Sequence, residues 1–181
     1  MSKEKSSVKD MTIVGSFAAL LAILSQIMIT IPGLGVPLTL QTFSVALTGR
    51  ILGWKKGSLS ILIYILIGLI GIPVFAGFGA GPQTLLGKSG GFIIGFLPLS
   101  AFCGIFKKVK PVANVMLSLL GLILCHAIGT IQFSFIMDME IIPSFLMVSL
   151  PFLVKDGICV LAALGIGKLV RKRFISSQIR I

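Results

Sequence analysis

The chain has 181 residues, of which 56% are hydrophobic and only 12% are charged, and its mean hydropathy is +1.10. A water-soluble domain carries roughly 25% charged residues, so this composition excludes a soluble globular protein. The formal net charge of +11 does not indicate nucleic-acid binding, because the Lys and Arg residues stand in short runs between apolar stretches. That arrangement is typical of the loops of a membrane protein.

Six apolar stretches follow one another along the chain, and each approaches the length of about 20 residues that a helix needs to cross a bilayer. They cover residues 11–31, 37–52, 57–72, 91–106, 112–136 and 151–170. The first follows a polar tail at 1–10 and is too long for the core of a signal peptide, so we expect a retained helix that ends at Pro32 and Gly33. The second is short and begins with Thr39 and Gln41, whose polar groups either bond between helices or contact a polar ligand.

A glycine-rich segment at 74–91 separates the third and fourth stretches and cannot be a regular helix throughout. Non-helical backbone at membrane depth occurs only where it is buried in protein or lines a wet cavity. Glycine allows the backbone to approach a ligand closely, and Phe75 and Phe92 offer flat apolar walls. An exposed loop is the alternative. The Gly-Lys-Ser at Lys88 is not a Walker A motif, because Pro82 stands where the first glycine belongs.

The last apolar region, 141–170, is longer than one span and is interrupted by Pro143 and Pro151. Proline disfavours helical geometry in the residue before it but suits the first turn of a helix. We therefore predict a short helical or interfacial segment at 144–150, followed by the final span from Pro151. A single tilted span from Ser144 is the alternative.

Lys155 and Asp156 lie inside this last stretch and are functional candidates, because charges within a membrane are costly. Near the start of a helix, the helix dipole stabilises a carboxylate by about 0.3–1 kcal/mol. Neighbouring residues project about 100° apart on a helix, so we expect the two side chains to face different partners. Alternatively, Lys155 snorkels outward and Asp156 caps the helix. His126, the only histidine, is expected to bond a carbonyl of a neighbouring helix, with ligand or proton binding as the alternative.

The charges also predict a topology. With six spans, all Lys and Arg residues except Lys88 and Lys155 fall on one side of the membrane, which places both termini and the basic tail at 171–181 in the cytoplasm. We expect a single transmembrane domain over 1–181. The cysteines lie in apolar runs without a CxxC pattern, so no metal site is expected. There are no paired carboxylates and no Ser/His/Asp set, and we expect neither an enzyme nor a cofactor.

Several strings in this chain together resemble the BioY family, the biotin-binding substrate subunits (S components) of energy-coupling-factor (ECF) transporters. They are VPLTLQT at 36–42, GLIGIPVFAG at 68–77, GKSGGFIIGF at 87–96 and PFLVKD at 151–156. The resemblance implies an all-α, ECF S-component-like bundle of about six transmembrane helices in the plasma membrane. It implies that biotin is captured at the outer side and delivered inward with a coupling transmembrane subunit and two ATPase subunits.

The resemblance also suggests a substrate site. The residues that we expect in it are Thr39, Gln41, Phe75, Gly77, Lys88, Phe92, Lys155 and Asp156. We hypothesise that Asp156 accepts a ureido N–H of biotin, since a charge-assisted bond is about twice as strong as a neutral one. Lys88 or Lys155 would pair with the biotin carboxylate. Phe75 and Phe92 would pack against the ring system, and the VPLTLQT loop would cover the pocket.

Other features concern partners and departures from the family. Ala18 and Ala22 match the AxxxA helix surface that packs against the coupling subunit. Val-Lys-Asp at 154–156 stands where Pro-Gly-Asp is common, and Gly-Lys-Ser-Gly-Gly at 87–91 stands where Gly-Pro-Thr-Gly-Gly is common. Three other functions compete: an S subunit for another vitamin, a membrane-embedded enzyme such as a lipid transferase, and a structural or pore-forming membrane protein.

Overall fold

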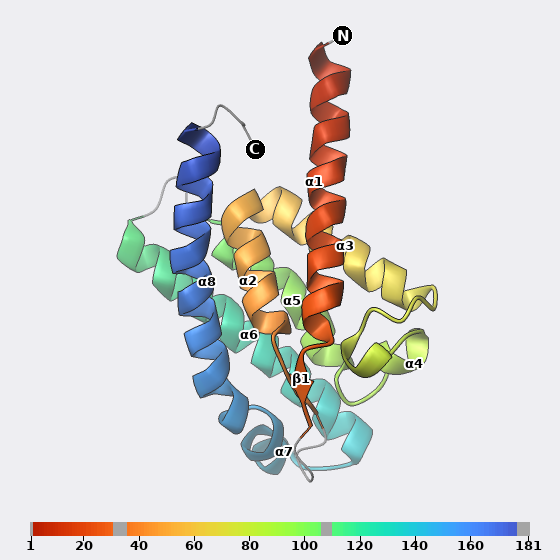
Figure 1. The fold of residues 1–181 in the computed structure, drawn as a ribbon. Helices are drawn as coiled ribbons and strands as arrows, with labels where there is room; N and C mark the ends of the chain where they lie inside the picture. The colour runs from red at the N-terminus through yellow and green to blue at the C-terminus, as the bar shows by residue number, and fades with distance from the viewer. Residues whose placement is uncertain (1, 31–35, 106–109, 177–181) are drawn as a thin grey trace.

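The computed structural model describes residues 2–30, 36–105 and 110–176. Within these ranges the elements are α1 (Ser2–Ser25), β1 (Met28–Ile29), β2 (Leu38–Thr39), α2 (Gln41–Leu52), α3 (Trp54–Leu69), η1 (Ala76–Phe78), α4 (Pro82–Leu85), α5 (Gly90–Cys103), α6 (Pro111–Met137), α7 (Ile141–Val148) and α8 (Leu150–Ser176). Figure 1 shows the start of α1 and the end of α8 at one end of the bundle and α7 with β1 at the other. The predicted all-α fold class is confirmed, with one short β-hairpin in addition.

Each predicted span coincides with a helix, and most bounds differ by only a few residues. The first differs most: α1 includes most of the polar tail and ends at Ser25. Beyond it the chain turns into an antiparallel hairpin in which Met28 pairs with Thr39 and Ile29 with Leu38. The hairpin was not predicted, because Met28 and Ile29 continue the apolar run of the helix. Pro32 and Gly33, the predicted helix end, lie outside the described residues.

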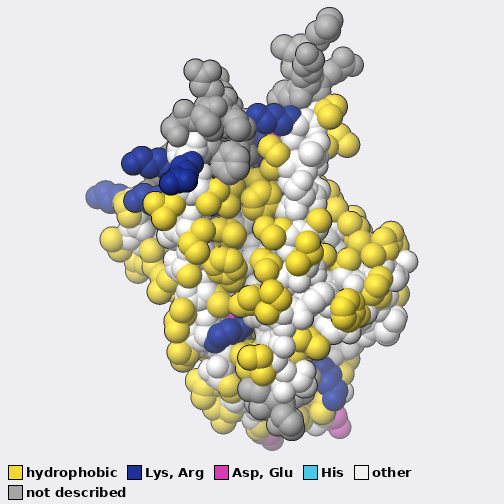
Figure 2. Space-filling view, viewed as in Figure 1, with side chains coloured by type: hydrophobic (Ala, Val, Ile, Leu, Met, Phe, Trp, Pro, Cys, Tyr) yellow, Lys and Arg dark blue, Asp and Glu magenta, His cyan; other side chains and the backbone are white. Residues whose placement is uncertain are grey.

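The six helices that match the predicted spans fall into two length classes. Val8–Ser25, Pro111–Met137 and Leu150–Arg173 are long and apolar enough to cross a membrane. Helices α2, α3 and α5 have 12, 16 and 14 residues, which is less than the usual range of roughly 17–25 for a full crossing. Hydrophobic side chains cover much of the surface along the bundle in Figure 2. The chain is therefore a membrane protein in which three long helices are accompanied by three shorter ones.

The region after α6 forms two helices rather than one tilted span. Helix α7 ends at Val148, and α8 begins at Leu150 with Pro151 in its first turn. Ser149 lies at the break and is fully buried. The predicted short segment is thus correct, and the alternative of a single span from Ser144 is wrong.

Glycines bring α5 and α6 close together. A Cβ added to Gly95 would lie 2.7 Å from the Cα of Cys125, and one added to Gly91 would lie 2.6 Å from the carbonyl oxygen of Ile128. Only a residue without a side chain allows this approach. Because the two backbones nearly touch, the side chains that flank these glycines meet across the interface.

The glycine-rich segment is irregular, as predicted, and two glutamines hold it in place. Gln26, directly after α1, donates from Nε2 to the carbonyl of Phe75 (3.0 Å) and accepts the N–H of Phe78 (3.0 Å). On the opposite side, Gln132 of α6 donates to the carbonyl of Leu85 (2.6 Å). Backbone groups at membrane depth need such partners. The segment is therefore fixed to α1 and α6 and is not an ordinary exposed loop.

Ala18 and Ala22 of α1, which we expected to form a partner surface, face the interior of the bundle. Ala18 is only 3% exposed and belongs to the hydrophobic core, and Ala22 is partly buried against that core. Gly15 and Ala19, a second pair of small residues four positions apart on α1, are exposed instead. Sequence spacing alone could not distinguish these two registers, because both are small-xxx-small pairs.

Candidate functional site

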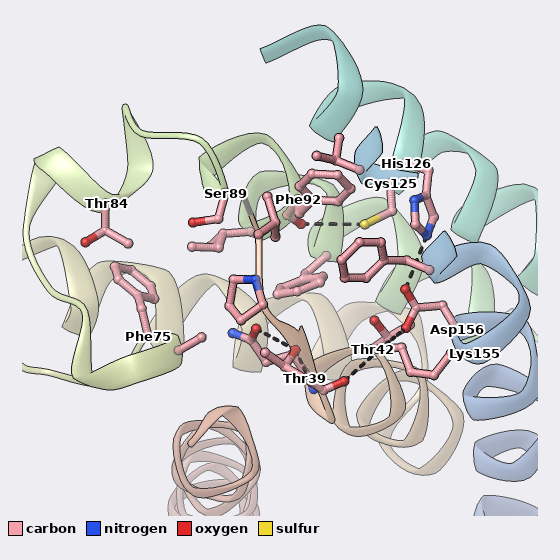
Figure 3. A pocket seen from close by; sticks show the side chains of 18 residues that line it. Thr39, Thr42, Phe75, Thr84, Ser89, Phe92, Cys125, His126, Lys155 and Asp156 are labelled. Atoms are coloured by element: carbon pink, nitrogen blue, oxygen red, sulfur yellow. Dashed lines mark hydrogen bonds and ion pairs between the residues drawn. The ribbon is translucent and has the colours of Figure 1, made fainter. Parts of the chain in front are cut away.

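A cavity of about 110 Å³ lies where α2, α5, α6, α7 and α8 meet the glycine-rich segment. Figure 3 shows its polar lining from several elements, with Thr39 and Thr42 below, Thr84 and Ser89 on one side, and the Asp156 carboxylate on the other. Phenylalanine side chains supply apolar walls between them. The volume is smaller than the roughly 300–1,000 Å³ of most small-molecule sites, so a ligand of that size requires the lining to move apart.

The charged wall of the cavity is built around Asp156, which is 4% exposed. Its Oδ1 lies 2.5 Å from Lys155 Nζ and its Oδ2 lies 3.3 Å from His126 Nε2. Lys155 Nζ also donates to the carbonyl of Thr39 (2.8 Å). The expectation that Lys155 and Asp156 do not pair is wrong, because the long lysine side chain folds back to its neighbour. A buried carboxylate is tolerated when it is paired with opposite charge, and here the half-buried Lys155 provides that charge.

His126 connects this wall to a buried chain of hydroxyl groups. Its Nδ1 lies 3.1 Å from Ser149 Oγ, which lies 2.6 Å from Thr130 Oγ1. The ring also meets Phe92 edge-on, with centroids 5.6 Å apart. The prediction that His126 bonds a carbonyl is wrong, since its partners are a carboxylate and a hydroxyl. The signal that could have found this role was a second ionisable residue deep in another apolar stretch, namely Asp156.

The start of α2 forms an ordered polar corner of the cavity. Thr39 Oγ1 donates to Gln41 Oε1 (2.9 Å), and Gln41 Nε2 donates to the hydroxyl of Tyr64 (2.8 Å). Tyr64 in turn meets the ring of Phe75 edge-on at 5.4 Å. Phe75 fits there because Gly68 has no side chain: a Cβ at Gly68 would lie 2.1 Å from Phe75 Cζ. The buried Phe75 ring is thus a rigid wall.

The structure brings most of the expected site residues together. Those that line the cavity are Thr39, Gln41, Phe75, Phe92, Lys155 and Asp156. Gly77 and Lys88 do not line it, and both are exposed. Gly77 has φ +66° in the η1 turn, a conformation that favours glycine, so its role there is to shape the segment. Sequence reasoning missed Thr84, Ser89, Cys125 and Phe152 as lining residues.

Comparisons with known proteins agree with this architecture. The family model of the BioY family matches residues 1–176. The chain belongs to the BioY family. One relative, the probable biotin transporter BioY of Pyrococcus horikoshii, is 40% identical over 148 residues, which are 82% of this chain and 87% of that protein. The biotin transporter BioY of Rhodobacter capsulatus is 34% identical over 131 residues, 69% of each protein.

A solved structure supports the same assignment for this BioY-family chain. The crystal structure of the S-component for biotin from an ECF-type ABC transporter matches with a TM-score of 0.84 and 29% identity, over 93% of both chains. The predicted fold class, an ECF S-component-like helical membrane protein, is therefore confirmed. Among the described residues, no group of three His, Cys, Asp or Glu side chains is placed to hold a metal ion.

Proposed function

We propose that this chain is the biotin-binding substrate subunit of an ECF-type transporter. The observation that supports this best is the group formed by buried Asp156 and His126 with the half-buried Lys155 at the wall of a cavity, in a fold shared with a biotin S-component. The chain binds its substrate without chemical change, and biotin is cargo rather than cofactor. Relatives named as biotin transporters support the same substrate.

The contact between Lys155 and Asp156 suggests which end of biotin meets them. The ureido group of biotin has two N–H donors and one carbonyl acceptor on the same small ring. Asp156 can accept an N–H while Lys155, 2.5 Å from it, donates to the carbonyl. Pairing Lys155 with the distant carboxylate of biotin would instead draw it away from Asp156 and Thr39. We therefore assign the ureido group to this wall.

The remaining parts of biotin then find suitable surroundings. The apolar thiophane ring and tail would pack against Phe92 and Phe152, which line the cavity beside the charged wall. The carboxylate would reach the side where Figure 3 places Thr84 and Ser89. These hydroxyls can donate hydrogen bonds to a carboxylate.

Equilibrium binding to the purified chain in detergent tests this arrangement. Biotin and its uncharged amide, biotinamide, are compared for wild type and Lys155→Gln, with Lys88→Gln as a control because Lys88 is exposed and outside the cavity. If Lys155 contacts the ureido group, Lys155→Gln weakens both ligands by the same factor. A loss confined to biotin would assign Lys155 to the carboxylate. Failure of wild type to bind biotin, or a preference for riboflavin or thiamine, would refute the proposed function.

We further propose that the coupling subunit of the transporter, which acts with two ATPase subunits, contacts α1 through Gly15 and Ala19. Both residues are exposed, and a Cβ at Gly15 would meet nothing within 4 Å. Small residues at this spacing let two helices approach closely. Ala19→Leu should abolish co-purification with the coupling subunit and leave biotin binding intact, whereas Ala162→Leu on the exposed face of α8 should affect neither. Normal assembly of Ala19→Leu would exclude this surface.

We also propose that the chain is a single plasma-membrane domain with both termini in the cytoplasm. The described ends of α1 and α8 lie at the same end of the bundle (Figure 1), where Lys and Arg side chains gather over α8 (Figure 2). Basic residues favour the cytoplasmic side. Labelling of Lys88→Cys but not Lys55→Cys by an impermeant thiol reagent in intact cells is expected, and the reverse pattern would invert the topology.

A further inference from the structure

The polar corner of the cavity at the start of α2 has a second layer behind it, which is formed by Tyr64 of α3. Tyr64 is only 1% exposed and does not itself line the cavity. Its hydroxyl accepts a hydrogen bond from Nε2 of Gln41 (2.8 Å), and Gln41 does line the cavity. An effect of the Tyr64 hydroxyl on a bound ligand therefore passes through Gln41.

The hydrogen bonds around Tyr64 give the amide of Gln41 a single direction. Ser25, at the end of α1, directs its one hydroxyl hydrogen at the carbonyls of Ala22 and Val74, both 2.6 Å away. The oxygen of Ser25 is thus left to accept from the hydroxyl of Tyr64, with which it bonds. A phenolic hydroxyl has only one hydrogen, so Tyr64 meets Gln41 as an acceptor. The amide nitrogen of Gln41 therefore points to Tyr64, and its amide oxygen points away.

Thr39 connects this corner to the charged wall of the cavity. Its hydroxyl donates to Oε1 of Gln41 (2.9 Å) and accepts from the backbone N–H of Gln41 (3.3 Å). Side-chain bonds of this kind hold a short turn of backbone in one conformation. The carbonyl of Thr39 belongs to that turn and accepts from Nζ of Lys155 (2.8 Å). The ammonium of Lys155 thus lies between this carbonyl and the carboxylate of Asp156, which is 2.5 Å away.

A continuous chain of contacts therefore joins the hydroxyl of Tyr64 to Lys155, and Figure 3 shows its last part, where Thr39 meets Lys155. The stem of a lysine is flexible, so a half-buried ammonium keeps one position only where its surroundings hold it. In the proposed function this ammonium donates to the ureido carbonyl of biotin. We propose that Tyr64 is a positioning residue for biotin binding. Through this chain, its hydroxyl fixes the ammonium of Lys155 where the ureido carbonyl meets it.

Removing the hydroxyl alone tests this role, because Tyr64→Phe keeps the ring that packs edge-on against Phe75. In equilibrium binding to the purified chain, Tyr64→Phe should weaken biotin about three- to tenfold, the effect of losing one neutral hydrogen bond. The control is Ser60→Ala, which removes a buried hydroxyl of the same helix that donates to the carbonyl of Val14 (2.7 Å). Its affinity for biotin should equal that of wild type. Unchanged affinity in Tyr64→Phe, or equal losses in the two variants, would overturn the proposal.

A double-mutant cycle separates positioning from a general loosening of the fold. Lys155→Gln removes the ammonium that the chain holds, so adding Tyr64→Phe to it should change the affinity for biotin by less than about twofold. A further loss as large as that of Tyr64→Phe alone would mean that the hydroxyl acts independently of Lys155, and would overturn the proposal.

A ligand-side comparison asks the same question of the single variant. In 2-thiobiotin a sulfur replaces the ureido oxygen, and sulfur is a weak hydrogen-bond acceptor. Wild type should therefore prefer biotin, and Tyr64→Phe should reduce that preference. Loss of both ligands by the same factor would show a merely structural role. This role of Tyr64 rests on the proposed function, and the two fail differently: a wild type that does not bind biotin refutes both, whereas normal binding by wild type and Tyr64→Phe alike refutes only the role of Tyr64.

Discussion

Replacing Asp156 with asparagine removes one negative charge from the proposed biotin site and keeps the side-chain shape. In the structure the carboxylate forms an ion pair with Lys155 Nζ at 2.5 Å and lies 3.3 Å from His126 Nε2. Asparagine keeps one acceptor oxygen but turns its amide group toward one of these partners. A hydrogen bond to a charged group contributes about 1.5–3 kcal/mol and a neutral one about 0.5–1.5 kcal/mol. We therefore expect Asp156→Asn to weaken biotin binding by about 1–2 kcal/mol, or roughly five- to thirtyfold.

Isothermal titration calorimetry in detergent measures this change, with thermal unfolding of the same samples as a check on folding. Asp138→Asn is the matched control: Asp138 is exposed and has φ +50°, a left-handed conformation that asparagine also adopts readily. Its affinity for biotin should equal that of wild type. Unchanged affinity in Asp156→Asn would remove the carboxylate from the binding site. Equal losses in both variants would show a general effect of charge and refute the reasoning.

Three further substitutions and one double variant test the walls of the cavity by thermal unfolding and biotin binding. Gly68→Ala should destabilise the fold by about 1–3 kcal/mol, because its Cβ would lie 2.1 Å from Phe75 Cζ; unchanged stability would mean that this ring is not fixed. Phe75→Ala should lower the free energy of unfolding by about 3–5 kcal/mol. The double variant with Gly68→Ala should lose less stability than the sum of the two single losses, because the two residues touch. His126→Phe should lower the free energy of unfolding by about 1–3 kcal/mol, because Asp156 and Ser149 each lose one of their partners. Wild-type stability and affinity would exclude His126 from the polar wall.

The helical part of the fold could be predicted from the sequence because its signals are local. Apolar runs of bilayer length and the proline at position 151 gave the order of the helices and the break before α8. The hairpin of β1 and β2 left no such signal, since Met28 and Ile29 continue the apolar run of α1 and pair with residues near position 38 only after the chain has turned back. The pairing of two short strands depends on how the chain turns between them, and the composition of the apolar run does not indicate that turn.

The sequence could predict those site residues whose charge is energetically costly inside a membrane. It could not predict those whose role depends on the direction in which the side chain points. Asp156 could be singled out because a carboxylate within a membrane-spanning stretch is costly and is usually kept for a function. The choice between Lys88 and Lys155 as the cation at the cavity depended on which side chain points inward, and only Lys155 does. Likewise, the sequence contained two equivalent small-residue pairs on α1, and only the packing of the helix against its neighbours showed that Ala18 faces the core.

Helix α1 connects the exposed pair of Gly15 and Ala19 to the segment that lines the cavity. Gln26, directly after the last turn of α1, holds the backbone of Phe75 and Phe78 beside the cavity, while Gly15 and Ala19 are exposed two to three turns closer to the amino terminus. Because a helix is stiff, a tilt of α1 would move this backbone through the two contacts of the Gln26 amide. Gln132 of α6 holds a later part of the same segment, at Leu85, so a change in the angle between α1 and α6 would shift these two parts of the segment relative to each other.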